Sequence, residues 1–336
     1  MKLEYRKIKL KLRHTFRIAR SADDFRYSVI TRLKIHDIEG FGEATPSERY
    51  GQSVESVEEA LSRIKPRHLK SVDYIEDSLE ELSSILGDQR AALAAIDLAL
   101  FDILGKRVNT PLYTLLGLNP AKTPVTSYTI GIDTAEVIKE KVLEAKRFPV
   151  LKIKMGLEND YEIMETIRKV TDKPVRIDAN EGWSKEEAYE KIKWLEDKGV
   201  QFIEQPLPAD RIEDTRWLKE RVKLPLFADE SVQTSSDIPG LIGAFDGINI
   251  KLMKSGGIRE ALRMIHTARA CGMKIMLGCM IESSIGITAA AHLSPLVDYA
   301  DLDGNLLITN DPAKGVGEKR GKLILPNFPG LGVHVI

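Results

Sequence analysis

The chain has 336 residues, in which 49 Lys and Arg nearly balance 50 Asp and Glu, for a formal net charge of −1. This length is sufficient for one large barrel domain and a smaller one, and the balanced charge excludes a general attraction to nucleic acid or to an anionic membrane. No uncharged apolar stretch reaches the roughly 18 residues of a membrane span, and the N-terminus lacks a signal-peptide core. We therefore expect a cytoplasmic protein without membrane or nucleic-acid partners, in which Cys271 and Cys279 are buried thiols.

The first third of the chain has the pattern of a small α+β domain. Alternating apolar and polar residues predict antiparallel strands, and helical periodicity then predicts three helices. The strands are expected at 3–12, 29–35 and 41–44, and the helices at 54–64, 73–86 and 90–105. The last helix is apolar nearly all round, so we expect it to be buried between two layers.

From residue 125 the pattern changes to strands that alternate with helices. The strands are expected at 125–130, 150–155, 174–178, 201–204, 225–229, 246–251, 274–279 and 298–303, and helices at 134–147, 160–170, 185–197, 258–270 and 286–292. Eight strands in this order, with no visible chain reversal, favour a closed barrel over an open sheet. We divide the chain into an α+β capping domain at 1–122, a barrel at 123–314, and a C-terminal return to the capping domain at 315–336.

Five charged residues end successive strands of this pattern at intervals of about 25 residues, the length of one strand, one helix and their loops. They are Lys154, Asp178, Glu204, Asp229 and Lys251. The carboxyl ends of parallel barrel strands meet at one face, and that face carries the chemistry of such barrels. We therefore expect these side chains to converge.

Asp178, Glu204 and Asp229 are carboxylates on consecutive strands, which lie about 4.8 Å apart in a sheet. Negative charges this close repel each other unless a cation neutralises them, and three hard oxygen ligands suit Mg²⁺. The alternative, in which Asp178 and Asp229 cap the following helices, does not account for Glu204, because Glu is a poor cap. The residues expected to orient the ligands are Arg176, Asn180 and Glu230.

Lys152 and Lys154 are two residues apart on one strand, so both are expected to point into the barrel. Lys251 ends a strand roughly across the barrel, so Lys154 and Lys251 would flank the metal from opposite sides. A carbon acid bound to Mg²⁺ could lose its α-proton to one of these lysines. The metal and Lys152 would stabilise the enediolate, and the opposite lysine would return a proton and invert the carbon.

Burial and like charge are expected to lower the pKa of the two base lysines toward the working pH. The alternative is that the lysines are solvated or salt-bridged. For Lys254, in the loop after the strand, we expect a solvated side chain.

Six stretches of the chain resemble the enolase superfamily, and within it the muconate-lactonizing-enzyme subgroup. They are Gly42-Glu-Ala44, Leu151-Lys-Ile-Lys154, Arg176-Ile-Asp-Ala-Asn180, Ile203-Glu-Gln-Pro206, Ala228-Asp-Glu-Ser231 and Asn249-Ile-Lys-Leu-Met-Lys-Ser-Gly-Gly257. The resemblance runs over essentially the whole chain. It implies an α/β fold, a modified TIM barrel of the (β/α)7β type with an α+β N-terminal capping domain. It also implies one Mg²⁺ per subunit and, as is usual in the family, an oligomer of identical subunits.

Within that subgroup the chain most resembles the dipeptide epimerases of the L-Ala-D/L-Glu type, through Asp301-Leu-Asp303 on the last strand. In that family such a pair binds the N-terminal ammonium of a dipeptide, and the metal binds the C-terminal carboxylate. The resemblance therefore implies that the C-terminal residue is epimerised. The alternative is an acid pair solvated at the barrel mouth.

Two loops of the capping domain, at about 13–26 and 45–52, are expected to cover the barrel mouth and to set specificity. In Ala-Glu epimerases an arginine of the first loop receives the substrate's γ-carboxylate. The resemblance places Ser21 at that position, with Arg20 beside it, and it places Glu282 next to the substrate. We predict a dipeptide substrate without naming its side chains.

Three other functions compete with this one. A cycloisomerase or an o-succinylbenzoate synthase of the same subgroup would use the same metal and lysines, but its substrate carries no ammonium group for Asp301 and Asp303. A sugar-acid dehydratase would use a His base in place of Lys251, and none of the six histidines falls at a predicted strand end. A non-catalytic barrel would leave the inward lysines unexplained.

Overall fold

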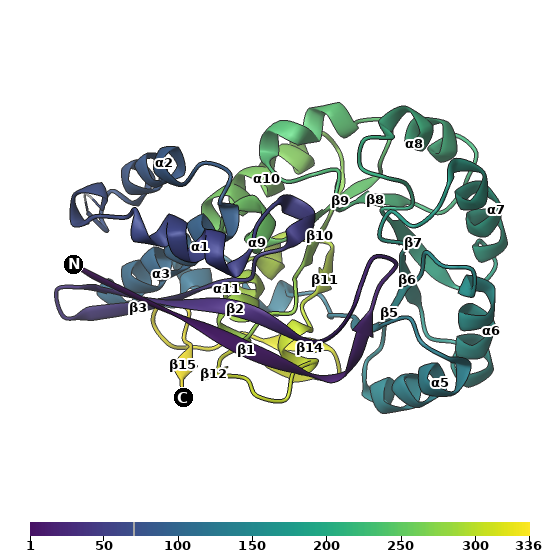
Figure 1. The fold of residues 1–336 in the computed structure, drawn as a ribbon, viewed down its shortest axis with the longest axis horizontal. Coiled ribbons are helices and arrows are strands. Elements are labelled where there is room, and N and C mark those ends of the chain that lie inside the picture. The colour runs from purple at the N-terminus through teal and green to yellow at the C-terminus, as the bar shows by residue number, and fades with distance from the viewer. Residues whose placement is uncertain (70) are drawn as a thin grey trace.

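The capping domain begins with an antiparallel sheet. In the computed structural model, which describes residues 1–69 and 71–336, β1 (Lys2–Arg17), β2 (Ala22–Ile35) and β3 (Ile38–Ala44) pair in chain order. Figure 1 shows β1 and β2 as a long hairpin that reaches across toward the barrel. The expectation of a loop over the whole of 13–26 is wrong. Strand pairing resumes after an irregularity in register and continues to a short turn at 18–21.

The helices of this domain are α1 (Val54–Ser62), α2 (Ile75–Leu86) and α3 (Arg90–Arg107). The strand β3 approaches α3 so closely that a Cβ at Gly42 would lie 1.8 Å from the carbonyl oxygen of Ala95. The helix α3 also contacts α9 (Leu252–Ser255) and α10 (Ile258–Ala270) of the barrel. Its burial between two layers, expected from its apolar sequence, is confirmed.

Eight parallel strands form the second sheet, in sequence order from first to last. They are β4 (Tyr128–Ile130), β5 (Leu151–Lys154), β6 (Val175–Asp178), β7 (Val200–Glu204), β8 (Leu226–Ala228), β9 (Gly247–Ile250), β10 (Lys274–Gly278) and β11 (Tyr299–Asp301). A parallel bridge between Thr126 and Ala300 joins the two ends of the sheet and closes it. The predicted barrel and all eight predicted strand positions are confirmed.

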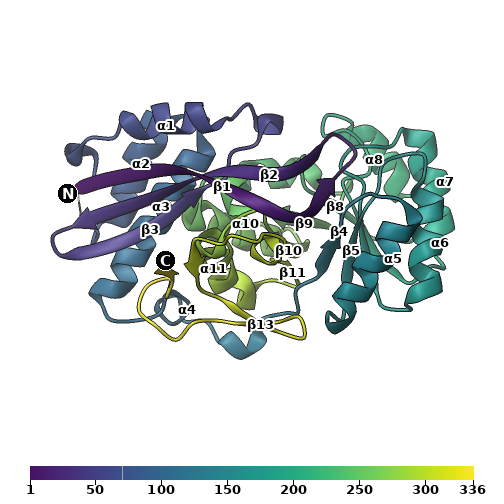
Figure 2. The ribbon, with the colours of Figure 1, turned by 60° about the horizontal axis from the view of Figure 1, so that its bottom comes forward.

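The helices of the barrel lie outside its strands, as Figure 2 shows from a second direction. They are α5 (Ala135–Glu144), α6 (Asp160–Val170), α7 (Lys185–Leu195), α8 (Ile212–Lys219), α9 (Leu252–Ser255), α10 (Ile258–Ala270) and α11 (Ser284–Leu293). The short helix α4 (Leu112–Leu115) precedes the first barrel strand. No helix within 1–69 or 71–336 combines the length and the apolar character that crossing a membrane requires.

The register of the parallel strands brings the predicted charged residues to one level. Lys154 is the direct partner of Asp178, and Asp178 is the direct partner of Glu204. Because all eight strands run in the same direction, their carboxyl ends open toward one mouth. The fold therefore gathers the charged strand ends at a single face.

The last residues of the chain form two small antiparallel pairs. The strand β12 (Ala313–Lys314) pairs with β15 (His334–Val335), and β13 (Gly317–Lys319) pairs with β14 (Lys322–Ile324). The backbone N–H of Leu331 donates to Asp102 of α3 at 2.8 Å. We retain the division at 122 and 314 as a proposal.

Buried carboxylates of the capping domain bind the first turns of two barrel helices. Asp97 accepts hydrogen bonds from the backbone N–H of Ile258 at 2.6 Å and of Arg259 at 3.2 Å, where α10 begins. Glu43 accepts from the backbone N–H groups of Ser283 and Gly286, each at 3.0 Å, where α11 begins. Helix N-termini carry unpaired donors and partial positive charge, so these contacts tie the two domains together.

The contact between Asp97 and α10 predicts the effect of one substitution. Gly257 has φ +113°, and a Cβ there would lie 2.4 Å from the carboxyl carbon of Asp97. We expect Gly257→Ala to lower the free energy of unfolding by about 2–4 kcal/mol, from backbone strain and displacement of Asp97. Chemical denaturation measures this loss.

Gly272→Ala is the matched control, because Gly272 has φ +70° with no atom within 4 Å of the added Cβ among the described residues. It should lose only about 1 kcal/mol. Equal losses in the two variants would contradict the proposed clash.

Candidate active site

Three buried carboxylates converge at the barrel mouth. One oxygen from each of Asp178, Glu204 and Asp229 lies within 4.8 Å of the others. Asn249 Nδ2 donates to Glu204 Oε1 at 2.7 Å, and Glu204 Oε2 lies 2.7 Å from the Nζ of the buried Lys152. Three hard carboxylate oxygens this close together fit a small divalent cation.

The two predicted base lysines bind opposite ends of this carboxylate set. Lys154 Nζ lies 2.6 Å from Asp178 Oδ2, and Lys251 Nζ lies 2.7 Å from Asp229 Oδ2. In the order of the sheet, β5 and β9 stand on either side of the three strands β6, β7 and β8. The barrel therefore brings Lys154 and Lys251 to the carboxylates from two sides.

Lys152 lies one layer deeper than Lys154 and contacts three carboxylates. Its Nζ is 2.7 Å from Asp301, 2.7 Å from Glu204 and 3.1 Å from Asp178. Burial alone lowers the pKa of Lys152, but these negative charges outweigh it and hold the pKa well above its usual value. Lys152 is therefore a fixed positive charge within the carboxylate set.

Lys254 is a residue that sequence reasoning placed wrongly. The short helix α9 turns its side chain inward, where it is fully buried and its Nζ lies 2.5 Å from Asp229 Oδ1 and 2.6 Å from the Asp229 carbonyl oxygen. Burial lowers the pKa of Lys254 despite the charge of Asp229. The expectation of a solvated lysine is wrong because the helical turn α9 begins directly after Lys251 and brings the Lys254 side chain to Asp229.

The charges of the site shift several pKa values. Burial by itself lowers the pKa of Lys251, yet Asp229 outweighs burial and raises it, so the expected lowering is wrong for this lysine. Burial raises the pKa of Asp178, but Lys154 and Lys152 outweigh burial and lower it. Burial and the neighbouring Asp178 charge raise the pKa of Glu204 to about 8. Opposite charges therefore outweigh burial at Lys251 and Asp178, whereas burial dominates at Glu204.

Asp301 and Asp303 lie together but make different contacts. Asp301 binds Lys152 through Oδ2 and accepts from Ser127 Oγ at 2.7 Å through Oδ1. Asp303 accepts from the backbone N–H of Thr129 at 2.6 Å. Burial and the charge of Asp301 raise the pKa of Asp303 to about 7.

The other predicted residues are distributed around this centre. Asn180 N donates to Asp178 Oδ1 at 3.0 Å, and its side chain reaches Glu230 Oε1 at 3.4 Å. Arg176 instead donates to the carbonyl oxygen of Ala300 at 2.6 Å, toward the floor of the barrel. Glu282 is buried and accepts from the backbone N–H of Met280 at 2.7 Å, which holds its own loop.

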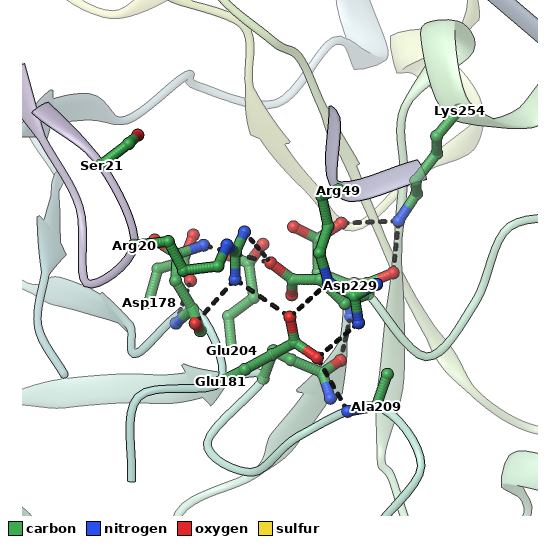
Figure 3. Close-up of polar contacts among 12 residues, drawn as sticks. Arg20, Ser21, Arg49, Asp178, Glu181, Glu204, Ala209, Asp229 and Lys254 are labelled. Carbon is green, nitrogen blue, oxygen red and sulfur yellow. Dashed lines mark hydrogen bonds and ion pairs between the residues drawn. The ribbon is translucent and has the colours of Figure 1, made fainter. Parts of the chain in front are cut away.

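A cavity over the carboxylates is lined by both domains. The capping domain contributes Phe16, Ile18, Arg20, Arg26, Thr45, Pro46, Ser47, Arg49 and Tyr50, and the barrel contributes Lys152, Lys154, Lys251, Asp301 and Asp303 among others. Ser21 is not among the lining residues described, and Figure 3 shows it on the hairpin away from the carboxylates. Both expected capping segments thus reach the barrel mouth.

Arg20 is engaged by the protein itself. It donates to Asn180 O at 2.7 Å, Glu181 Oε2 at 3.0 Å and Glu230 Oε1 at 2.7 Å. Glu181 also binds Arg49, a contact that sequence reasoning missed. The two residues are 132 positions apart, and no spacing rule connects a loop of one domain to a loop of the other.

Comparison with known proteins agrees with this geometry. Residues 4–117 match the mandelate racemase / muconate lactonizing enzyme N-terminal domain, and residues 134–336 match the enolase C-terminal domain-like family. An L-Ala-D/L-Glu epimerase of Bacteroides thetaiotaomicron is 45% identical over 100% of this chain and 88% of its own length. An L-Ala-D/L-amino acid epimerase of Pedosphaera parvula is 45% identical over 97% of this chain and 96% of its own.

Solved structures show the same similarity. The substrate-liganded L-Ala-D/L-Glu epimerase of Bacillus subtilis superposes with a TM-score of 0.94 at 32% identity, over 99% of this chain and 98% of its own. The dipeptide epimerase of Cytophaga hutchinsonii, complexed with Mg and D-Ala-L-Val, gives 0.92 at 30% identity, over 99% and 95%. The chain belongs to the mandelate racemase / muconate lactonizing enzyme family of the enolase superfamily. It is an isomerase of the racemase and epimerase type.

The carboxylate set predicts a metal-dependent stability. A cation that binds the folded chain raises Tm by mass action, so millimolar MgCl₂ should raise the Tm of the wild-type protein in a thermal-shift assay. Glu204→Gln removes one charged ligand and should abolish most of this shift.

The control is Glu282→Gln, which alters a second buried acid whose pKa burial also raises to about 8, outside the ligand set. This variant should keep the full Mg²⁺ response. A loss of the response in both variants would contradict the assignment of Glu204 as a ligand.

Proposed function

We propose that this chain, a dipeptide epimerase, inverts the α-carbon of the C-terminal residue by moving a proton between two lysines. Relatives named as epimerases match essentially its whole length, and a similar structure holds Mg and a dipeptide. The observation that carries the two-lysine mechanism is the position of Lys154 at the end of β5 and of Lys251 directly after β9, at either side of the carboxylates. Inversion requires a base on one face of a carbon and an acid on the other.

Mg²⁺ is the cofactor, and Asp178, Glu204 and Asp229 are the residues that would hold it. When bound there, the ion supplies positive charge that acidifies the substrate's α-proton and offsets the carboxylates that raise the pKa of Lys251. Lys254 is in contact with Asp229 from the far side, so it fixes the orientation of that carboxylate.

Lys154 and Lys251 are the proposed proton carriers. The neutral amine of one removes the α-proton, while the ammonium of the other delivers a proton to the opposite face. Their roles exchange between the two stereoisomers. Lys152 lies between the carboxylates. Its positive charge stabilises the negative charge that develops on the substrate when the enediolate forms.

Asp301, at the end of β11, and Asp303, two residues further on, have different roles in this proposal. Asp301 has one oxygen on Lys152 and the other on Ser127, so it positions Lys152. Asp303 lines the cavity and is the residue proposed to bind the substrate's N-terminal ammonium. A free amine at the substrate's N-terminus therefore distinguishes this function from the cycloisomerase and synthase alternatives.

Single lysine variants test the mechanism. Lys154→Ala and Lys251→Ala should each lower epimerisation by at least about a thousandfold, since one proton carrier is lost. Each should still exchange the α-proton of one stereoisomer in D₂O, and the two variants should act on opposite stereoisomers. Mass spectrometry across a library of L,L- and L,D-dipeptides measures both outcomes.

Lys141→Ala is the control, because Lys141 is also buried but pairs with Asp133 at 2.9 Å away from the carboxylates. Its epimerisation should match that of the wild-type protein. Full turnover in both Lys154→Ala and Lys251→Ala would refute the two-lysine mechanism.

Substitution of the acid pair should separate binding from chemistry. Asp303→Asn removes a charge-assisted contact of about 1.5–3 kcal/mol and should raise KM for dipeptides by about 10- to 100-fold with a smaller change in kcat. Asp301→Asn should mainly lower kcat, because Lys152 loses its partner. The same kcat effect in both variants would contradict the division of roles.

The raised pKa of Asp303 predicts a pH dependence. Its pKa is about 7, so the carboxyl group is increasingly neutral below that pH and attracts an ammonium group less. KM for dipeptides should therefore rise as the pH falls from about 8 to 6, and steady-state kinetics should find this rise reduced in Asp303→Asn. An equal rise in the variant would assign the titration to another group.

A further inference from the structure

Glu181 joins two segments of the capping domain to the barrel. It lies three residues after Asp178, in the loop between β6 and α7. Arg49 of the 3-10 helix at Glu48–Tyr50 binds both of its oxygens, with Nε and Nη2 each at 2.7 Å. Arg20 of the hairpin turn binds Oε2 at 3.0 Å. Figure 3 shows Glu181 between these two arginines.

The barrel holds this carboxylate in place. Glu181 Oε1 accepts from the backbone N–H of Ala209 at 2.8 Å, in the next loop around the barrel mouth. Its backbone N–H donates to Gln205 O at 2.9 Å. Asn180 and Glu181 have φ +46° and +66°, a left-handed conformation that costs about 1–3 kcal/mol per residue outside glycine. The loop therefore keeps an unfavourable backbone shape that directs Glu181 toward the two arginines.

The charges of the cluster balance. Arg20 also binds Glu230 at 2.7 Å, so two guanidinium groups meet two carboxylates. The Glu181 side chain is only 10% exposed, whereas that of Arg49 is 37% exposed. A bidentate pair with one buried partner is stronger than an ordinary surface ion pair, and its exposed side still responds to salt.

Both segments held by Glu181 also line the cavity. The hairpin turn contributes Ile18, and the second segment contributes Ser47 and Tyr50. A wall that is already ordered when the substrate arrives reduces the conformational entropy lost on binding.

We propose that Glu181 is a positioning residue that latches both cavity-covering segments of the capping domain to the barrel and thereby sets how tightly substrate is held. The effect of Glu181 on substrate binding rests on the proposed function. Its effect on the order of the two segments does not depend on any substrate.

Hydrogen exchange followed by mass spectrometry tests the latch without turnover. Full-length wild-type protein and Glu181→Gln are compared in MgCl₂ without substrate, in peptides that cover 13–26 and 45–52. We expect exchange to be at least about fivefold faster in both segments of the variant, because one charge held both in place. Unchanged exchange in either segment overturns a shared latch.

Kinetics with L-Ala-L-Glu tests the effect on substrate. Glu181→Gln should raise KM by about tenfold and change kcat by less than about threefold. The KM of the wild-type protein should rise as NaCl is increased from about 0.05 to about 0.5 M, because salt screens the ion pairs. The KM of the variant should rise less. A fall in kcat alone, or equal salt dependence in both proteins, overturns the proposal.

A matched control is available in the same domain. Arg32 binds both oxygens of Glu39, with Nε at 3.0 Å and Nη2 at 2.5 Å, on the capping sheet outside the cavity. Glu39→Gln should leave exchange at 13–26 and 45–52 and the KM unchanged, and a change equal to that of Glu181→Gln would overturn the latch. If wild-type protein turned over no dipeptide, the proposed function would fail while the exchange measurement would still decide the latch.

Discussion

Compensation of buried charge is the constraint on which the rest of this structure depends. The ammonium groups of Lys152, Lys154, Lys251 and Lys254 lie buried at the barrel mouth against carboxylates that include those of Asp178, Glu204, Asp229 and Asp301. A buried ion is costly unless an opposite charge and hydrogen bonds accompany it. Each member is therefore fixed by its neighbours, so the strand order that closes the barrel also determines which charges meet.

This constraint has two consequences for the chemistry. The groups proposed to exchange protons, Lys154 and Lys251, each form an ion pair with one carboxylate of the described residues, at 2.6 and 2.7 Å. Lys152, whose proposed task is only to carry charge, has three. The lysines proposed to exchange protons thus have fewer carboxylate partners than the lysine proposed to keep its proton. The side chains that stabilise the barrel mouth are therefore also those proposed for catalysis.

The sequence predicts those parts of the structure that repeat. Strand positions and the convergence of Asp178, Glu204 and Asp229 follow from one interval, because parallel strands joined by helices of similar length must end at one face. Lys254 was misplaced because its orientation depends on one turn of helix after the repeat ends. The direction of the Lys251 pKa shift was missed because it depends on a 2.7 Å contact with Asp229, which spacing alone does not give.

Contacts between the domains were beyond prediction for a related reason. Pattern rules relate residues within one element or one repeat, whereas Arg49 and Glu181 belong to different domains. The hairpin at 1–35 shows the same limit, because the expected loop at 13–26 is shortened where Phe16 and Arg17 pair with Asp23 and Ala22 after an irregularity in register.

The helix ends capped by Asp97 and Glu43 have a consequence for recombination. Because α10 and α11 begin against acids that another domain supplies, the barrel half does not carry everything that its own helices need. A chimera that joined this barrel to the capping half of a distant homologue would leave both helix starts exposed unless the donor supplied acids at the same places. This architecture therefore favours evolution in which the capping domain and the barrel are inherited together.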